Sequence, residues 1–135
     1  RRCDLPRGDN GHVDDTLIFD ARARVLADLQ ARGHATPGAV SLLEDAVSSR
    51  TWWAEQWPEG VVYVAGLVAQ DVQDALLEQV GRWPLCLGCG DAPEHALYIH
   101  PDLGGPDPTW VCEESGTPVA SLGTLSSPGP AGPTA

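Results

Sequence analysis

The sequence predicts an α+β fold, in which a three-helix antiparallel body precedes a small C-terminal β-hairpin. Two observations support this prediction. Between residues 14 and 82, apolar side chains recur at helical spacing in three segments that are separated by Gly or Pro. Residues 83–122 instead combine turn residues with short alternating runs, and they hold three of the four Cys. A chain of 135 residues has room for a helical body with such a small unit attached.

The N-terminal residues 1–13 are expected to form a flexible segment, because Pro and Gly interrupt them repeatedly. The Arg-Gly-Asp tripeptide at 7–9 is interpreted as a turn. The first helix is predicted over residues 14–32, with Asp14 and Asp15 in the first turn and Gly33 as the stop. Its apolar stripe contains Ile18, Val25 and Leu29, and this pattern places Arg22, Arg24 and Asp28 off the stripe.

The second helix is predicted from Pro37 to about residue 56, because Thr36 is a good N-cap and Pro is favoured at the first helical position. Three Trp lie near its end, at positions 52, 53 and 57, and core packing is favoured for them over a partner surface. A third helix is predicted from Pro58 to about residue 80. Its polar face contains Gln70, Asp71, Gln73, Asp74 and Glu78. The three acids, Asp71, Asp74 and Glu78, share one side of the helix and are expected to be solvated rather than to bind a cation.

The C-terminal part contains a group of candidate metal ligands. Cys86 and Cys89 form a C-x2-C pair followed by Gly90, a spacing at which two thiolates on a tight turn can bind one ion. Residues 94–100 (EHALYIH) and 108–112 (PTWVC) read as two strands around a Gly- and Pro-rich turn, and the second strand ends in Cys112. The alternative, a disulfide between Cys3 and one of these cysteines, is disfavoured because Cys3 is isolated in the sequence.

Residues 83–122 resemble the zinc-ribbon and rubredoxin-like group, in which two C-x2-C-G knuckles lie at one end of a β-hairpin. Cys86, Cys89 and Gly90 match the first knuckle, and Cys112 and Gly116 match the second. Ser115 stands where this group has its fourth Cys. The resemblance therefore implies a structural zinc site with one ligand replaced, and it disfavours an iron–sulfur cluster, which requires four thiolates.

The fourth ligand is predicted to be His95. If the hairpin turns near Gly104 and Gly105, Cys112 lies opposite about Leu97 and His100 lies opposite about Thr109. His100 would then sit roughly 10 Å along the hairpin from the Cys112 end, because strands rise about 3.3 Å per residue. His100, Glu113, Glu114 and water remain alternatives. The predicted metal ligands are thus Cys86, Cys89, His95 and Cys112, and we predict no catalytic residue and no further cofactor site.

The apolar residues of the ribbon, Leu97, Ile99, Trp110 and Val111, are expected to dock on the helices. The predicted organisation is a flexible segment at 1–13, a helical domain at 14–82, a zinc ribbon at 83–122 and a disordered tail at 123–135. The tail is predicted from its low-complexity composition.

The charge distribution argues against nucleic-acid binding. The net charge is −11, there is no Lys, and residues 83–135 contain six acids but no Lys or Arg. Such a surface repels phosphates and anionic bilayers. The longest apolar run, Val61–Ala69, is about half the length that crosses a membrane, so no membrane association is expected.

The sequence therefore predicts a cytoplasmic, non-enzymatic module with a structural zinc ribbon that binds a protein partner as an adaptor or regulator. One alternative is a zinc enzyme in which three Cys and a water bind the metal and Glu94, Glu113 or Glu114 acts as a base. Another is an acidic DNA mimic that inhibits a DNA-binding protein. The Arg-only, Ala-, Gly- and Pro-rich composition resembles that of small proteins from actinobacteria or their phages.

Overall fold

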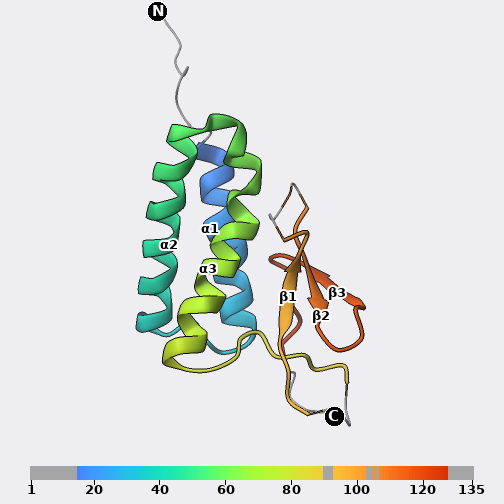
Figure 1. Ribbon diagram of the computed structural model, residues 1–135. Coiled ribbons are helices and arrows are strands. Elements are labelled where there is room, and N and C mark those ends of the chain that lie inside the picture. The colour runs from blue at the N-terminus through green and yellow to red at the C-terminus, as the bar shows by residue number, and fades with distance from the viewer. Residues whose placement is uncertain (1–14, 90–92, 103–104, 106, 128–135) are drawn as a thin grey trace, which may run out of the picture.

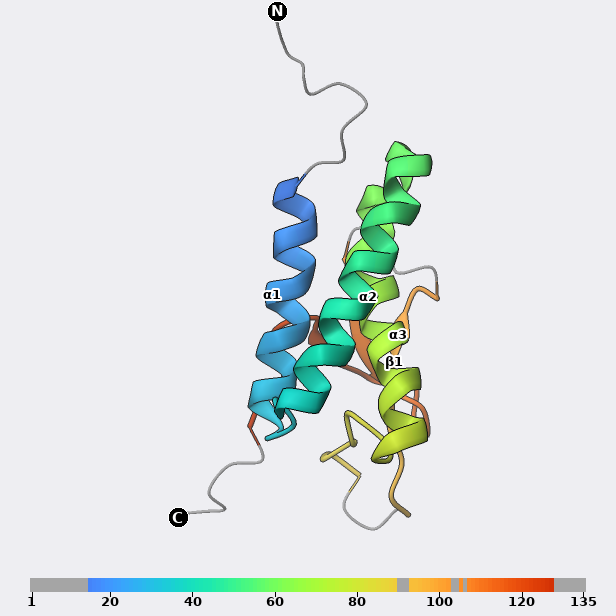
Figure 2. The same cartoon turned by 90° about the vertical axis from the view of Figure 1, so that its left-hand side faces the viewer.

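The computed structural model describes residues 15–89, 93–102, 105 and 107–127, and it has the predicted α+β architecture (Figure 1). The helices are α1 (Asp15–Ala31), α2 (Pro37–Gln56) and α3 (Val64–Gln79), and a 3-10 helix, η1 (Pro58–Tyr63), precedes α3. The strands are β1 (Leu97–His100), β2 (Thr109–Cys112) and β3 (Pro118–Ser121), and they form an antiparallel sheet in the order β1-β2-β3. The two views in Figures 1 and 2 show the sheet on one side of the bundle, next to α3.

The predicted ends of the first two helices are confirmed to within a residue or two. Gly33 follows α1 with a φ of 72°, the left-handed conformation that Gly adopts at low cost. Thr36 caps α2, because its hydroxyl accepts a hydrogen bond from the amide of Ala39 at 3.1 Å. The third helix differs from the prediction, because residues 58–63 form a 3-10 turn.

The aromatic side chains explain why Gly60 lies in this turn. Gly60 is buried, and a Cβ at this position would lie 2.5 Å from the Trp57 ring and 2.8 Å from the Trp53 ring. Trp53 and Trp57 pack edge to face with ring centroids 5.4 Å apart, and Trp57 stacks on Tyr63. Trp53 is half-buried, as a packing role requires, but Trp52 and Trp57 remain exposed.

The two parts of the chain share one hydrophobic core. The helical stripes meet in the bundle, where Val25, Leu43 and Val68 have no solvent exposure. The same cluster contains Trp83, Leu97, Ile99 and Trp110 from the ribbon, and Trp83 packs edge to face with Trp110. The expected docking of the ribbon on the helices is therefore confirmed for its largest apolar residues.

The register of the hairpin is as predicted, with Leu97 opposite Cys112 and His100 opposite Thr109. The sheet adds a third strand that the sequence did not indicate, with an irregularity between Trp110 and Val111 where β2 pairs with β3. β3 is an edge strand of four residues that starts with Pro118 and is largely exposed. A short strand of this kind lacks the apolar alternation that marks a half-buried strand.

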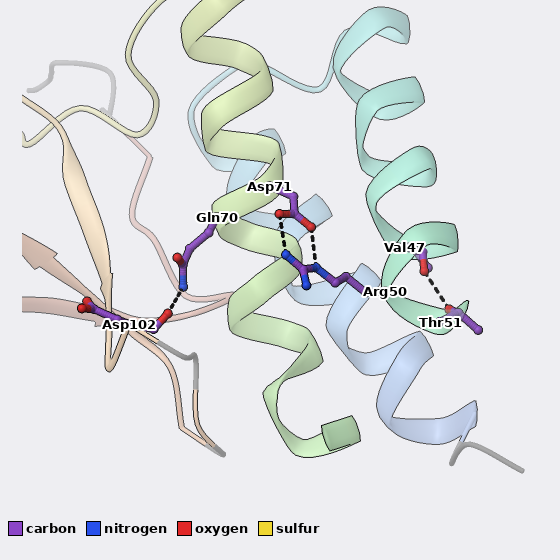
Figure 3. A network of polar contacts seen from close by, with 6 residues as sticks. All are labelled: Val47, Arg50, Thr51, Gln70, Asp71 and Asp102. Carbon is purple, nitrogen blue, oxygen red and sulfur yellow. Dashed lines mark hydrogen bonds and ion pairs between the residues drawn. The ribbon is translucent and has the colours of Figure 1, made fainter. Parts of the chain in front are cut away.

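The expected solvation of the acids on α3 is confirmed for Asp74 and Glu78, which are exposed, but not for Asp71, which pairs with Arg50. Gln73 donates from Nε2 to the carbonyl oxygen of Leu97 at 2.6 Å, and Gln70 donates to the carbonyl of Asp102. Asp71 accepts two hydrogen bonds from Arg50 of α2, at 2.7 and 2.9 Å (Figure 3). α3 therefore connects α2 on one side with the β1 hairpin on the other.

Asp28 was predicted to lie off the apolar stripe, but it is completely buried. Its Oδ2 accepts hydrogen bonds from Trp110 Nε1 at 2.8 Å and from the Gly123 amide at 2.7 Å, and its Oδ1 accepts one from the Leu125 amide at 3.0 Å. Three donors compensate the carboxylate for lost hydration, which is the condition for burying it.

The same contacts correct the predicted start of the disordered tail. The amides of Gly123 and Leu125 bind Asp28 of α1, and Leu125 is buried. Several predictions lie outside the described residues: the flexible segment 1–13 with Cys3, the positions of Asp14, Gly90 and Gly104, and residues 128–135 of the tail.

Among the described residues, one helical segment, Pro58–Gln79, is long and apolar enough to cross a membrane by length and composition alone. The continuous apolar run within it, Val61–Ala69, is about half the length that crosses a membrane. In the structure, Val64, Val68 and Val72 of this segment are fully buried against the other helices. Its apolar character is thus accounted for by the bundle core.

Candidate metal centre

The four predicted ligands meet at one end of the hairpin. Cys112 is the last residue of β2, and the register of the sheet places the residues before Leu97 beside it. The Cys86 amide donates to the His95 carbonyl at 2.9 Å, and Leu85 bridges to Ala96. These backbone contacts bring the C-x2-C loop to the same end. Three separate chain segments therefore contribute to one site.

The ligand atoms of Cys86, Cys89, His95 and Cys112 all lie within 4.8 Å of one another, so this cluster could hold a metal ion. Cys112 Sγ is 3.7 Å from Cys86 Sγ, 3.6 Å from Cys89 Sγ and 3.3 Å from His95 Nε2. Metal bonds of about 2.3 Å to sulfur and about 2.0 Å to nitrogen give tetrahedral edges of roughly 3.8 Å and 3.6 Å. The separations around Cys112 are thus close to those of a tetrahedral site.

These separations exclude a disulfide among the three cysteines, because an S–S bond is about 2.0 Å long. Cys86, Cys89 and Cys112 are all free thiols. The cluster does not include His100, which is exposed at the opposite end of β1. The geometry therefore selects His95, the histidine that the predicted register favoured.

His95 is oriented for metal binding. Its ring is buried, and Nδ1 lies 2.7 Å from the carbonyl oxygen of Pro93. A carbonyl oxygen only accepts, so Nδ1 carries the proton in this hydrogen bond and Nε2 of the neutral ring has a free lone pair. Nε2 is the atom that faces Cys112. A backbone acceptor on the remote nitrogen is the usual arrangement of a metal-binding histidine.

The turn after Cys112 has the form of a knuckle, although it lacks the second Cys. Gly116 adopts a φ of 73° and donates to the Cys112 carbonyl at 2.8 Å. The Ser115 amide lies 3.4 Å from Cys112 Sγ. Amide-to-sulfur contacts of this kind favour the thiolate form of a cysteine. The Ser115 amide thus faces the site, and the Ser115 hydroxyl lies 2.9 Å from Thr117 Oγ1.

The pKa values follow these contacts. Hydrogen bonds from Ser115, and to a smaller extent from Glu114 and His95, lower the pKa of Cys112 to about 6. The Pro93 carbonyl, supported by Cys112 and Cys86, raises the pKa of His95 to about 9. Hydrogen bonding to Cys112 and Cys86 raises the pKa of Cys89 to about 11. Without metal, these contacts favour the thiolate form of Cys112 and the protonated form of His95.

Arg32, in the turn that follows α1, supplies a positive charge that the sequence around the cysteines lacks. Its Nη1 donates to the Leu85 carbonyl at 2.6 Å, and its Nε donates to the Ser126 carbonyl at 2.9 Å. Burial lowers the pKa of Arg32, and the nearby Asp28 and Cys86 oppose this effect. The ribbon has no Lys or Arg of its own after residue 82, but the fold brings Arg32 next to Leu85. No sequence signal connects these two residues, because their contact depends on the packing of the ribbon on the helices.

A family model described as a domain of unknown function, DUF8819, matches residues 14–122. The chain belongs to the DUF8819 family. The match contains all three helices and all four residues of the Cys3His cluster. The bundle and the ribbon are therefore parts of one DUF8819 domain. No curated protein and no solved structure matches the chain.

Proposed function

We propose that Cys86, Cys89, His95 and Cys112 bind one structural zinc ion, and that this DUF8819 protein is a non-enzymatic module that binds a protein partner as an adaptor or regulator. The observation that supports the metal most strongly is the separation of the ligand atoms, all within 4.8 Å and close to tetrahedral edges around Cys112. This spacing fits one ion and does not fit a disulfide.

Zinc is the metal that this ligand set favours. Thiolates and a neutral imidazole in a tetrahedral arrangement suit Zn²⁺, whereas Mg²⁺ and Ca²⁺ prefer oxygen ligands. An iron–sulfur cluster would require a fourth thiolate, and Ser115 occupies that position of the knuckle. The site thus corresponds to a zinc ribbon of the rubredoxin-like group in which His95 takes the place of a cysteine.

The geometry favours a structural over a catalytic role. Four protein ligands complete a tetrahedral shell and leave no position for a water or a substrate. Cys112 and His95 are 2% and 5% exposed, so solvent has little access to this side of the centre. Three thiolates also donate enough charge to make zinc a weak Lewis acid. The zinc-enzyme alternative required both histidines to be absent from the site, and His95 lies in the cluster.

The interaction role is supported by charge. Four of the five described arginines bond within the chain: Arg22, Arg24 and Arg50 pair with acids, and Arg32 binds backbone carbonyls. The cations that a nucleic-acid surface needs are thus largely neutralised. We propose a protein partner for the acidic surface, and a reducing compartment such as the cytoplasm, because the site needs free thiols.

The test is metal analysis of untagged protein purified under reducing conditions. We expect about one zinc per chain, and a Cys112→Ser variant that retains much less. Zinc with two sulfur ligands and bound water in the X-ray absorption spectrum would contradict the closed Cys3His shell. The proposal would be overturned by folded, metal-free protein in which Cys86, Cys89 or Cys112 forms a disulfide.

A further inference from the structure

A pocket of about 270 Å³ lies between α3 and β1, beside the metal centre. Its apolar lining includes the exposed Leu77 and Tyr98 and the buried Trp83 and Leu97, and its polar groups include Asp74, Arg82 and Glu113. Leu77 is 57% exposed and Tyr98 is 37% exposed, although both are large apolar side chains. We call this site the α3–β1 pocket.

The pocket has an acidic rim. Asp74 of α3 and Glu113, which follows Cys112, are both exposed at its edge. Further acids follow closely in the sequence, with Glu78 one turn along α3 and Glu114 next to Glu113. Arg82 is the one cation among the pocket residues. A zinc ion with three thiolates would add one more net negative charge nearby.

A ligand that fits this pocket needs an apolar part to cover the walls and a positively charged part to pair with the acidic rim. An inorganic cation would satisfy the carboxylates but would leave Leu77 and Tyr98 exposed to water. An extended peptide with alternating apolar and basic side chains satisfies both, because successive side chains point in opposite directions. Its charge also complements a chain of net charge −11.

We propose that the α3–β1 pocket is the partner site of this domain, and that it binds a basic, extended segment of a partner protein. An apolar side chain of the segment packs on the exposed Leu77 and Tyr98, and neighbouring Arg or Lys side chains pair with Asp74 and Glu113. This inference rests on the proposed interaction role and names the chemistry of the partner.

Trp83, which lines the pocket, can report whether a peptide is bound there. Trp83 is buried, and its Nε1–H has no acceptor among the residues that the structure describes. An indole N–H without an acceptor responds strongly to nearby polar groups. A segment bound in the pocket should therefore shift the Nε1–H resonance of Trp83, which a Trp83→Phe variant assigns.

The experiment titrates zinc-loaded protein into a fluorescein-labelled synthetic peptide in which Arg and Leu alternate, with the corresponding Glu–Leu peptide as a second probe. We expect saturable binding of the Arg–Leu peptide alone, which weakens as salt rises. The variants Asp74→Asn and Glu113→Gln should each raise the Kd about two- to fivefold, whereas Arg82→Gln should lower it by a similar factor.

A matched control separates this site from general charge attraction. Glu55 and Glu59 are exposed acids at the opposite end of the bundle. If Glu55→Gln/Glu59→Gln weakens binding as much as Asp74→Asn/Glu113→Gln, or if the Trp83 resonance does not move, the proposed pocket is wrong. The zinc content of each sample is measured first. Protein with zinc but no peptide binding overturns this inference alone, and protein without zinc overturns the proposed metal site.

Discussion

The bundle and the ribbon of this DUF8819 domain are held together by different interactions. The bundle buries aliphatic side chains from three helices, including Val25, Leu43 and Val68. The ribbon has three strands of four residues each, and four ligand atoms converge at one end of it. A helical bundle of this size can be stabilised by apolar burial, whereas a unit of about 40 residues rarely can be. If the cluster binds a metal as we propose, the metal contributes mainly to the ribbon, whereas both regions share the apolar core.

Metal removal should give the largest effect. Structural zinc contributes on the order of 10 kcal/mol to folding of small metal-binding units. We expect Cys112→Ser, or a strong chelator, to unfold the ribbon while most helical circular dichroism remains. Backbone NMR of the zinc-free protein, with resonances of α2 compared with those of β1 and β2, measures this directly. Loss of all helical signal together with the ribbon would show that the two regions do not differ as we infer.

Truncating a core side chain of the bundle should lower the stability of the bundle and leave the metal site unchanged. Leu43 of α2 is fully buried, so Leu43→Ala should lower the free energy of unfolding by about 3–5 kcal/mol. Because Leu43 lies on α2, away from the ligands, zinc affinity at a temperature where the variant is folded should stay within a few-fold of the original. Urea unfolding and competition with a chromophoric chelator provide the two measurements. Leu77→Ala, at a residue that is 57% exposed, is the control and should change stability little.

Asp28→Asn tests the connection between the two regions. The amide has one acceptor oxygen where the carboxylate has two, so at least one of the donors from Trp110, Gly123 and Leu125 loses its partner. We expect a loss of about 2–3 kcal/mol in urea unfolding. The exposed Asp45→Asn serves as the matched control. Equal stability of the two variants would mean that the buried carboxylate does not fasten the ribbon to α1.

Gln73→Ala should give the smallest of these effects. It leaves the Leu97 carbonyl without the hydrogen bond from Nε2, at a cost of about 1 kcal/mol. Hydrogen exchange of the β1 amides should accelerate, since α3 then covers the strand less firmly. Gln79→Ala, at the exposed last residue of α3, makes the same substitution without that contact. An unchanged exchange rate in Gln73→Ala would indicate that apolar packing alone holds β1 on α3.

The sequence predicted the parts of the molecule that depend on local signals. The cap at Thr36, the stop at Gly33 and the apolar stripes gave the helix ends, and the turn residues gave the register that selected His95 over His100. The capping residues and the turn residues lie within or next to the helices and the hairpin that they determine.

The features that were missed depend on contacts between distant segments. Asp28 looks like a surface residue by helical spacing, and only the packed ribbon supplies the three donors that allow its burial. Arg32 reaches the metal centre, and Gln70 and Gln73 reach the β1 hairpin, through the same docking. The local sequence does not distinguish a polar helix residue that binds a distant segment from one that is solvated.

The Asp28 contacts also determine how far a fragment of the chain must extend at its C-terminus to keep the fold. The family match ends at residue 122, yet the amides of Gly123 and Leu125 bind the Asp28 carboxylate and the Ser126 carbonyl binds Arg32. A fragment that stops at 122 would leave a buried anion with one donor in place of three. We expect such a fragment to express poorly or to melt well below one that extends to residue 127. The folded domain therefore extends beyond residue 122, where the family match ends.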